Sequence, residues 1–256
     1  MKIIGLMSGT SMDGIDVCFA ETDGRKKFYI IDTLVTEYNK NTKFLIKKLN
    51  QNTEKLIKNK TFIKELAEKI TYDHFKAANK IIHKNKDKPV VIGFHGQTIL
   101  HLPSKFKSIQ IGNAKLLSKL LRKDVVYDFR KRDLSLHGQG APISPIYHKF
   151  LIEEKKLNFP SCFINIGGIT NISFCDKKKL IGFDTGPGNC LIDKFMKLKF
   201  NKNFDKFGQE AFKGKTCKKI VYYFLKNNFY ERSFPKSLDK SSFNNEFKKI
   251  VSLKMK

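Results

Sequence analysis

Short runs of alternating apolar and polar residues open the chain and predict β-strands joined by tight turns. Three such runs occupy residues 2–7, 15–21 and 28–36, and glycine-bearing links separate them. This alternation is typical of half-buried strands, and consecutive strands with short links pair as antiparallel neighbours. The first 36 residues therefore predict a three-stranded antiparallel meander.

The periodicity then becomes helical. In residues 42–59 and 61–86, Leu, Ile and Phe recur three or four positions apart, which indicates amphipathic helices covering a sheet. Strands and one helix alternate afterwards, and we expect strands at 89–94, 109–111 and 124–127 and a helix at 113–121. Strands first, followed by alternating helices and strands, indicate an α/β layer fold with a mixed sheet.

A second series of the same kind follows a helix expected at residues 146–155. Its strands are expected at 161–166, 170–175 and 179–183, with helices starting at 191–199 and then at 207–212 and 216–226. Two similar halves imply a duplicated architecture with a cleft between lobes, the first over residues 1–145 and the second over 146–256. The polar tail at 234–256 shows no cap, closing strand or apolar finish, so the second lobe looks incomplete.

Composition bounds the class of protein. The 256 residues are 41% apolar and 29% charged, which favours a soluble globular chain without membrane burial. A net charge of +26 would normally suggest RNA or an anionic membrane as a partner. However, only five of the fifty basic residues are Arg, and the Lys residues are dispersed. We therefore expect a lysine-rich composition rather than a nucleic-acid surface, with no nucleic-acid or membrane partner.

The cysteines and the N-terminus indicate the compartment. Five cysteines lie far apart without a C-x-x-C pair, which fits neither a zinc site nor a disulfide framework. Asp13 and Asp16 interrupt the apolar residues near the N-terminus, so no signal peptide is expected there. A cytoplasmic protein follows from both observations.

The first link between strands carries candidate chemistry. Residues 7–16 read M-S-G-T-S-M-D-G-I-D, and a turn of Gly, Ser and Thr exposes backbone N–H groups that can hold a polyphosphate. Thr10 and Ser11 add hydroxyl donors. Asp13 or Asp16 would repel a bare phosphate unless a divalent cation lies between them, as in magnesium–nucleotide sites. An ordinary hairpin turn is the alternative reading.

A polar, glycine-bearing loop is expected at residues 126–145, V-Y-D-F-R-K-R-D-L-S-L-H-G-Q-G-A-P-I-S-P. Asp128 and Asp133 flank Arg130 and Arg132 in this loop. We expect Asp128 to pair with one of these arginines and to be structural. Asp133 then remains as a candidate general base.

Two further glycine turns follow apolar strands in the second half. Residues 163–173 place Gly167 and Gly168 between strands, and residues 182–189, G-F-D-T-G-P-G-N, place Asp184 at a strand end before a helix. The start of a helix behind such a turn favours an anion. Neither turn matches the P-loop or dinucleotide-binding pattern. Facing phosphate turns on duplicated meanders are the layout of the actin-like ATPase and sugar-kinase superfamily.

Five motifs in order carry a more specific resemblance. They are G-L-M-S-G-T-S-M-D-G-I-D at 5–16, G-F-H-G-Q-T at 93–98, D-F-R-x-R-D at 128–133 with G-Q-G-A-P at 138–142, N-I-G-G-I-x-N-I-S at 165–173 and F-D-T-G-P-G-N at 183–189. Together they resemble the anhydro-N-acetylmuramic acid kinases over residues 1 to about 215. The resemblance implies a duplicated, RNase H-like (actin-like ATPase) two-lobe α/β fold.

The resemblance also implies a reaction of peptidoglycan recycling. With ATP, Mg²⁺ and water, such an enzyme opens the 1,6-anhydro ring of anhydro-N-acetylmuramic acid and phosphorylates O6. The products are N-acetylmuramic acid 6-phosphate and ADP.

Roles for individual residues follow from the same resemblance. Asp133 would be the base that activates water. The ATP phosphates would be bound by Gly9, Thr10, Ser11, Met12, Asp13, Gly14, Ile15 and Asp16 and by Gly167, Gly168, Asn171 and Asp184, with Asp13 and Asp184 also at the metal. The sugar would be bound by His95, Gln97, Thr98, Arg130 and Gln139. For His95, a packed imidazole at a strand end is the alternative. Four histidines outside the motifs are expected to be surface residues or to have their hydrogen bonds satisfied: His74, His83, His101 and His148.

Two departures from the family pattern matter for function. His137 stands where the family has glycine, so its backbone tolerates a side chain or the loop is displaced. Family members also continue beyond 256 residues with a segment that holds adenosine. We therefore expect the isolated chain to bind the sugar measurably and ATP poorly. A non-catalytic binding remnant, or one chain of a split enzyme, is the alternative, and a homodimer or a complementing C-terminal chain is left open.

Overall fold

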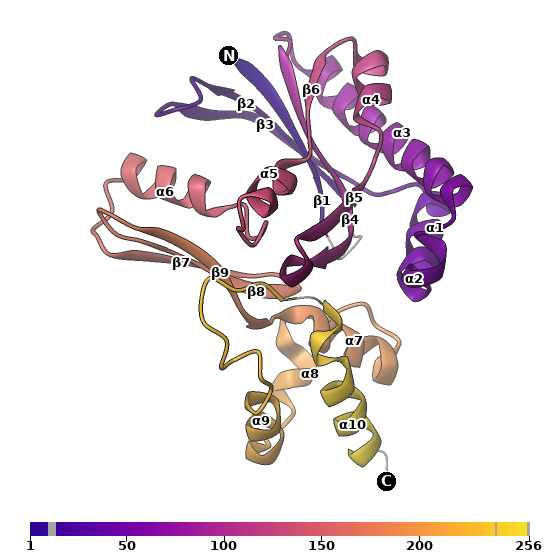
Figure 1. The fold of residues 1–256 in the computed structure, drawn as a ribbon, viewed down its shortest axis with the longest axis vertical. Helices are drawn as coiled ribbons and strands as arrows, with labels where there is room; N and C mark the ends of the chain where they lie inside the picture. Colours follow the sequence, from indigo (N-terminus) through magenta and orange to yellow (C-terminus); the bar gives the residue numbers. More distant parts are fainter. Residues whose placement is uncertain (10–13, 239, 255–256) are drawn as a thin grey trace. The chain divides into compact units, whose positions relative to one another are not determined.

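A computed structural model of the chain describes residues 1–9, 14–238 and 240–254. It contains two compact units, Met1–Gly140 and Ala141–Lys256 (Figure 1). The first unit ends at Gly140, whereas the sequence pattern placed a boundary after residue 145. No helix among the described residues is long and apolar enough to cross a membrane.

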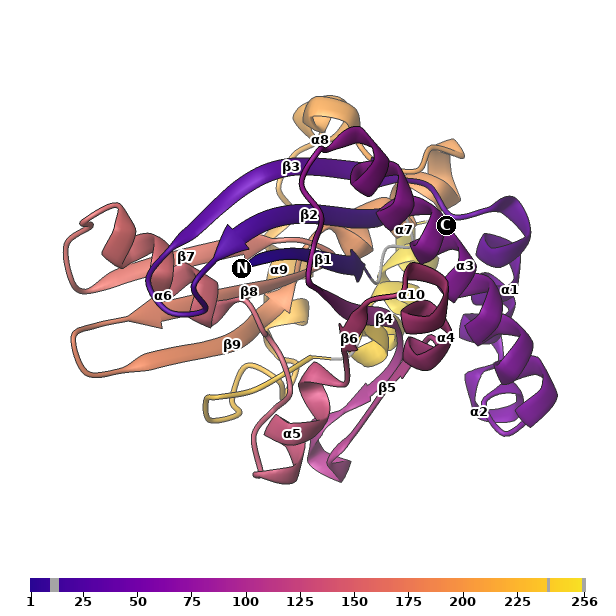
Figure 2. The same ribbon diagram turned by 90° about the horizontal axis from the view of Figure 1, so that it is seen from above.

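The first unit is built on the expected meander. Strands β1 (Lys2–Ser8), β2 (Ile15–Thr22) and β3 (Phe28–Thr36) pair as antiparallel neighbours. Strand β1 also pairs in parallel with β4 (Val91–Leu102), and the sheet has the order β3-β2-β1-β4-β5 with β6 beside β4 (Figure 2). The prediction of an α/β fold with a mixed sheet is therefore confirmed.

Strand β4 is longer than the sequence pattern indicated. Its first residues pair in parallel with β6 (Asp124–Val126), and its second half pairs antiparallel with β5 (Lys107–Ile111). The H-G-Q-T motif therefore lies inside the strand rather than after it. Gly96 makes this continuation possible, because its φ is +69° and a Cβ there would lie 2.8 Å from the Ile111 carbonyl oxygen.

Helices cover one face of this sheet. The two predicted helices are three, α1 (Lys40–Gln51), α2 (Thr53–Leu56) and α3 (Lys60–Lys84), because Asn52 leaves the helical region with φ −136°. Helix α4 (Ala114–Leu121) begins after Asn113, whose side chain accepts a hydrogen bond from Leu116 N. Helix α3 packs against β2, β3 and α4 and buries the main apolar core of the unit (Figure 1).

The segment with Asp133 is helical where a loop was predicted. Helix α5 (Phe129–Ser135) follows Asp128, which has φ +61°. Phe129 holds the helix against the sheet, since its ring tip would lie 3.5 Å from a Cβ on Gly93 of β4. A glycine on the strand thus gives room for the helix.

The second unit contains a second antiparallel meander. Strands β7 (Ser161–Ile166), β8 (Ile169–Cys175) and β9 (Leu180–Pro187) form a sheet of that order, as predicted apart from the length of β9. The other elements are α6 (Pro145–Glu154), α7 (Asn189–Phe200), η2 (Lys206–Gly208), α8 (Gln209–Phe212), α9 (Lys218–Leu225), η3 (Lys240–Phe243) and α10 (Asn244–Lys254). Because β9 extends to Pro187, Asp184 lies within the strand and not at its end.

The tail of the second unit also differs from the expectation. Phe243, four residues before Phe247, is 1% exposed and packs with Phe229 and Leu238 in a small buried cluster. Phe243 ends η3, and Phe247 on α10 is 7% exposed, so the tail does carry buried apolar side chains. The prediction that the tail lacks an apolar finish was wrong.

Candidate active site

The turn that follows β1 carries the first predicted phosphate site, and the structure describes the residues at its two ends. Thr10, Ser11, Met12 and Asp13 lie outside the described residues, so their ATP and metal contacts stay predictions. Gly14 must be glycine, because a Cβ would lie 2.6 Å from the Thr36 carbonyl oxygen. Ile15 is fully buried in the core, whereas Asp16 is exposed on β2 opposite Met7.

Two side-chain hydrogen bonds join β4 to the end of β1. Ser8 Oγ donates to the Gly96 carbonyl oxygen at 3.1 Å, and Gln97 Nε2 donates to the Gly9 carbonyl oxygen at 3.2 Å. Gln97 Oε1 in turn accepts from the Tyr38 hydroxyl at 3.2 Å. Burial raises the pKa of Tyr38 well above its ordinary value, so this hydroxyl remains a donor. Gln97, 1% exposed, therefore supports the backbone of the turn.

Buried His95 on β4 and half-buried Arg130 on α5 form a hydrogen-bonded pair. Arg130 Nε donates to His95 Nε2 at 3.0 Å, and His95 Nδ1 lies 2.9 Å from the Gly96 carbonyl oxygen. Because Nε2 accepts, the proton of the neutral ring is on Nδ1. Burial, together with the Arg130 charge, lowers the pKa of His95 to about 4, which keeps the ring neutral. His95 therefore lies inside β4 and not at the end of a strand, where the alternative interpretation placed it.

The Asp133 carboxylate is oriented by two glycines. Its Oδ2 accepts from Gly140 N at 2.6 Å, and the Asp133 carbonyl oxygen accepts from Gly138 N at 2.8 Å. A Cβ on Gly138 would lie only 2.2 Å from Oδ2. Arg130 Nη1 donates to the Gly140 carbonyl oxygen at 3.0 Å, so the same glycine contacts both side chains. Asp133 is an exposed residue, so its side chain is accessible to a ligand or water.

The neighbours of Asp133 differ from their predicted roles in one respect. Asp128 pairs with Lys131, with Nζ and Oδ2 3.6 Å apart, and not with an arginine as expected. These residues are one helical turn apart, so the pair is local and mostly solvated. Gln139 is half-buried between the two glycines, and Thr98 Oγ1 lies 3.4 Å from Gln110 Nε2.

His137 adopts the conformation that favours the glycine of the family pattern. Its φ is +63°, a region that is strained for residues with a Cβ. Its ring packs edge-on against Phe106, with ring centroids 5.0 Å apart. The loop therefore keeps the left-handed backbone, and the ring contact offsets part of the strain.

The second glycine turn and helix α7 are closed on each other. The N–H groups of Gly188, Asn189 and Cys190 donate to the carbonyl oxygens of Gly167 and Gly168 at 2.8–3.2 Å. These three N–H donors at the start of the helix are therefore already occupied. The expected binding of an anion by the start of this helix does not agree with these contacts. Contacts of phosphate with Gly167 and Gly168 themselves stay a prediction.

Asp184 and Asn171 are register partners on β9 and β8. Asp184 is 6% exposed, and its Oδ2 accepts from Leu238 N at 2.7 Å while its own N–H donates to the Lys236 carbonyl oxygen. Asn171 Oδ1 is buried with no hydrogen-bond partner in the part of the chain that the structure describes. A buried oxygen acceptor paired across strands with a carboxylate fits a hard cation such as Mg²⁺. No group of three possible metal-ligating side chains occurs among the described residues.

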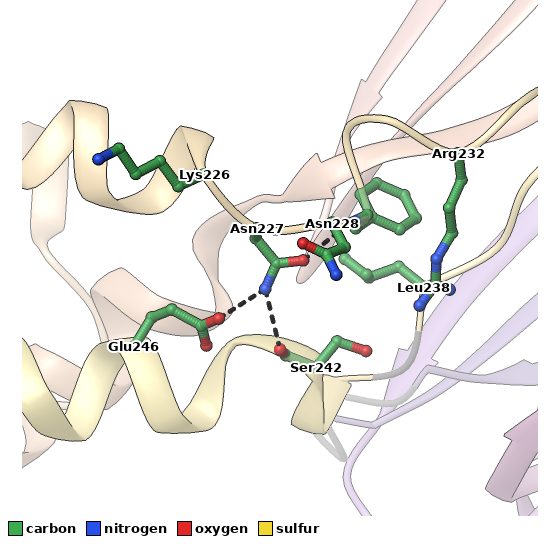
Figure 3. A pocket seen from close by; sticks show the side chains of 8 residues that line it. Lys226, Asn227, Asn228, Arg232, Leu238, Ser242 and Glu246 are labelled. Carbon is green, nitrogen blue, oxygen red and sulfur yellow. Dashed lines mark hydrogen bonds between the residues drawn. The ribbon is translucent and has the colours of Figure 1, made fainter.

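A cavity of about 390 Å³ in the second unit contains none of the predicted site residues. It lies where α10 faces the segment after α9, and is lined by Lys226, Asn227, Asn228, Phe229, Arg232, Leu238, Ser242 and Glu246. Asn227 Nδ2 donates to Glu246 Oε1 at 2.6 Å across it, and Lys226 points away from the group (Figure 3).

The histidines outside the motifs divide into exposed and buried. His83 is exposed, as expected. His74 is fully buried between Tyr38 and Phe94, with ring centroids 5.8 and 5.0 Å away. Its Nδ1 lies 2.8 Å from the Ile70 carbonyl oxygen, while Nε2 has no partner in the described part of the chain. The expectation of a surface or satisfied residue was wrong for this side chain.

Sequence reasoning did not single out Ser8 or Tyr38, which hold Gly96 and Gln97 in place. Ser8 stands inside the first motif, so its position was a usable signal. Tyr38 lies outside every motif and carries no local signal.

The mixed sheet, the two antiparallel meanders and the polar site along β4 and α5 define a mixed α/β protein whose architecture fits an α/β kinase. The sequence model of one family, described as anhydro-N-acetylmuramic acid kinase, matches residues 1–254. The chain belongs to the anhydro-N-acetylmuramic acid kinase family.

Individual relatives agree with this assignment. The chain is 42% identical over 226 residues to the anhydro-N-acetylmuramic acid kinase of Pelagibacter ubique (strain HTCC1062), covering 85% of this chain and 60% of the relative. It is 37% identical over 252 residues to that of Rhodopseudomonas palustris (strain ATCC BAA-98 / CGA009), covering 96% and 69%. It is 36% identical over 259 residues to that of Agrobacterium fabrum, covering 98% and 69%. The chain thus spans 60–69% of the length of these three relatives.

Proposed function

We propose that this chain provides the base and sugar-binding residues of an ATP-dependent kinase that hydrolytically opens 1,6-anhydro-N-acetylmuramic acid and phosphorylates O6. The observation that carries the proposal is the Asp133 carboxylate, whose Oδ2 is oriented by the Gly140 N–H although the residue as a whole is exposed. Family membership supplies the reaction and the substrate class. The product is N-acetylmuramic acid 6-phosphate, and the process is peptidoglycan recycling in the cytoplasm.

In the proposed mechanism, Asp133 Oδ1 accepts a proton from water. The water oxygen bonds to C1 of the sugar, and the C1–O6 bond breaks. The freed O6 accepts the γ-phosphoryl group, and ADP leaves. A positioned carboxylate serves as general base when it lies within hydrogen-bond reach of the water. Phosphoryl transfer then needs positioning and charge stabilisation more than covalent help.

Asp184 and Asn171 would hold the Mg²⁺ that accompanies ATP. Magnesium prefers oxygen ligands and usually binds one or two carboxylates together with phosphates and waters, and it neutralises charge on the phosphoryl groups when bound. The buried Asn171 Oδ1, which has no hydrogen-bond partner among the described residues, supports this assignment. Gly9, Gly14 and Asp16, at the described edges of the first turn, would contribute to the phosphate site.

The repeated meander supports a duplicated, actin-like architecture. Strands β1, β2 and β3 pair in the same antiparallel sequence as β7, β8 and β9, and a helix follows each set. Similar units that each carry a glycine turn are the layout of the sugar-kinase superfamily. We extend the proposal to this fold, with ATP and an amino sugar as the ligands.

The proposal is tested by replacing Asp133 with Asn. Asp133→Asn keeps the Oδ acceptor for Gly140 N–H but removes the base, so kcat is expected to fall about 100-fold or more with little change in sugar affinity. Asp128→Asn is the matched control, because Asp128 is an exposed acid directly before the same helix. This variant should retain turnover. An ADP-release assay and calorimetric titration with the anhydro sugar measure both quantities.

Two outcomes would contradict parts of this proposal. Full turnover by Asp133→Asn, with loss of turnover by Asp184→Asn, would move the base to Asp184, the buried carboxylate of the second unit. Sugar binding by the wild-type chain without ADP release would favour a binding module instead of an enzyme.

A further inference from the structure

The side chains of His95 and Arg130 connect two parts of the first unit that the motifs treat separately. On one side, the Gly96 carbonyl oxygen faces His95 Nδ1 at 2.9 Å and accepts from Ser8 Oγ at 3.1 Å. On the other, Arg130 Nη1 donates to the Gly140 carbonyl oxygen. A continuous series of hydrogen bonds therefore runs from the end of β1 to the residue that orients Asp133.

The contacts of His95 occupy both ring nitrogens. Nδ1 faces the Gly96 carbonyl oxygen, and Nε2 accepts from Arg130 Nε. The side chain is 7% exposed. An imidazole with one donor and one acceptor has no further hydrogen-bonding capacity to offer a sugar hydroxyl. This is at odds with the sugar contact that the motif resemblance implies for this residue.

We infer that His95 is a positioning residue: it fixes the Arg130 guanidinium, which holds Gly140 and, through the Gly140 N–H, the Asp133 carboxylate. The inference rests on the proposed function for its catalytic consequence, but not for its geometry. A planar guanidinium held at Nε keeps its Nη1 direction fixed, so loss of the acceptor on His95 frees the fork to rotate. A small displacement of a general base is enough to lower the rate strongly.

The first experiment needs no substrate. Nitrogen NMR of the histidine rings reads which nitrogen of His95 carries the proton. We expect the Nδ1–H form in the wild-type chain and in Arg132→Ala, the exposed neighbouring arginine on the same helix. Arg130→Ala should remove the fixed tautomer and raise the pKa of His95, because the adjacent positive charge is gone. An unchanged His95 signal in Arg130→Ala would overturn the inference whatever the enzyme does.

The second experiment is kinetic and uses matched variants. His95→Asn keeps a donor near Nδ1 but lacks the acceptor, so kcat should fall about 10- to 100-fold while KM for the anhydro sugar stays within about twofold. His95→Gln places an amide oxygen near Nε2 and should restore part of kcat. His83→Gln, an exposed histidine on α3, should behave as wild type.

A double-variant cycle separates positioning from a general loosening of the fold. If His95 acts through Arg130, His95→Phe combined with Arg130→Ala should have a kcat no more than about twofold below that of Arg130→Ala alone. A raised sugar KM with unchanged kcat in His95→Asn would overturn the inference and restore the contact role. A wild-type chain without turnover would remove the proposed function, while the NMR result would still decide the geometry.

Discussion

Gly138 shows how one missing side chain sets the geometry of a charged neighbour. The Asp133 carboxylate occupies the space where a Cβ on residue 138 would be. Glycine is therefore required by close approach, since the φ of Gly138 lies outside the left-handed region. The neighbouring His137 shows the reverse case: its backbone is in the left-handed region that favours glycine, yet the residue carries a side chain.

Gly138→Ala should impair catalysis more than stability. The new methyl group would displace the carboxylate, which is the mobile end of a side chain, so the free energy of unfolding should change by about 1 kcal/mol or less. The rate of ADP release should fall nearly as far as in Asp133→Asn. Gly5→Ala is the control, because the space that its new methyl group would enter is open out to 4 Å. Ordinary turnover in Gly138→Ala would show that the observed carboxylate position is not needed.

At the scale of elements, the glycine turn of the second unit and helix α7 form one piece of structure. Gly188 approaches the Gly167 carbonyl oxygen so closely that a Cβ would lie 2.2 Å from it. Three backbone hydrogen bonds depend on that approach. The obstructing atom is backbone, which cannot move aside as a side chain can.

Gly188→Ala should therefore destabilise the second unit by about 3 kcal/mol, because the turn and the helix must separate and lose hydrogen bonds. Chemical denaturation followed by circular dichroism measures the change. Gly214→Ala, in a loop of the same unit where a Cβ makes ordinary contact at 3.4 Å, is the control. Equal stability of the two variants would contradict the closed arrangement.

The elements also show what the sequence could and could not predict. Alternation identified the two meanders, and the pattern is clearest in β1 and β2, where alternate residues such as Ile4 and Leu6 or Ile15 and Val17 are buried. It ended β4 too early, since Gly96 and Gln97 break the apolar pattern while pairing with β5 continues it. Helix α5 has seven residues, too few for a helical period to stand out. Motifs collected the candidate site residues, but the bond between His95 and Arg130 joins positions 35 apart and has no local signal.

At the scale of the whole molecule, two buried neutral histidines make stability depend on pH. Burial lowers the pKa of both His74 and His95 to about 4, from an ordinary value of 6.5. Between these values the unfolded chain binds protons that the folded chain excludes. The contribution of these two neutral rings to the free energy of unfolding is therefore fully present above about pH 6.5. It is lost as the pH falls toward 4.

Each histidine should contribute roughly 3 kcal/mol to this loss at most. Urea denaturation between pH 7 and pH 4.5 measures it. His74→Asn removes one titrating group and should flatten the dependence, whereas His83→Gln should leave it unchanged. A slope that is the same in wild type and His74→Asn would show that His74 does not contribute.

The parallel pairing of β1 with β4 has a consequence for how the molecule folds. The hydrogen bond from Ser8 to Gly96 closes a loop of 88 residues, whereas β4 and β5 are joined by a short connection. Closing a long loop costs more chain entropy than forming a hairpin, and contacts between distant residues form more slowly. We therefore expect the β4–β5 hairpin to form before β1 docks. Only the bond from Ser8 to Gly96 waits for that late docking step, because the hydrogen bonds that link His95, Arg130, Gly140 and Asp133 lie within residues 95–140. A nascent chain could therefore orient its proposed general base before its central sheet is complete.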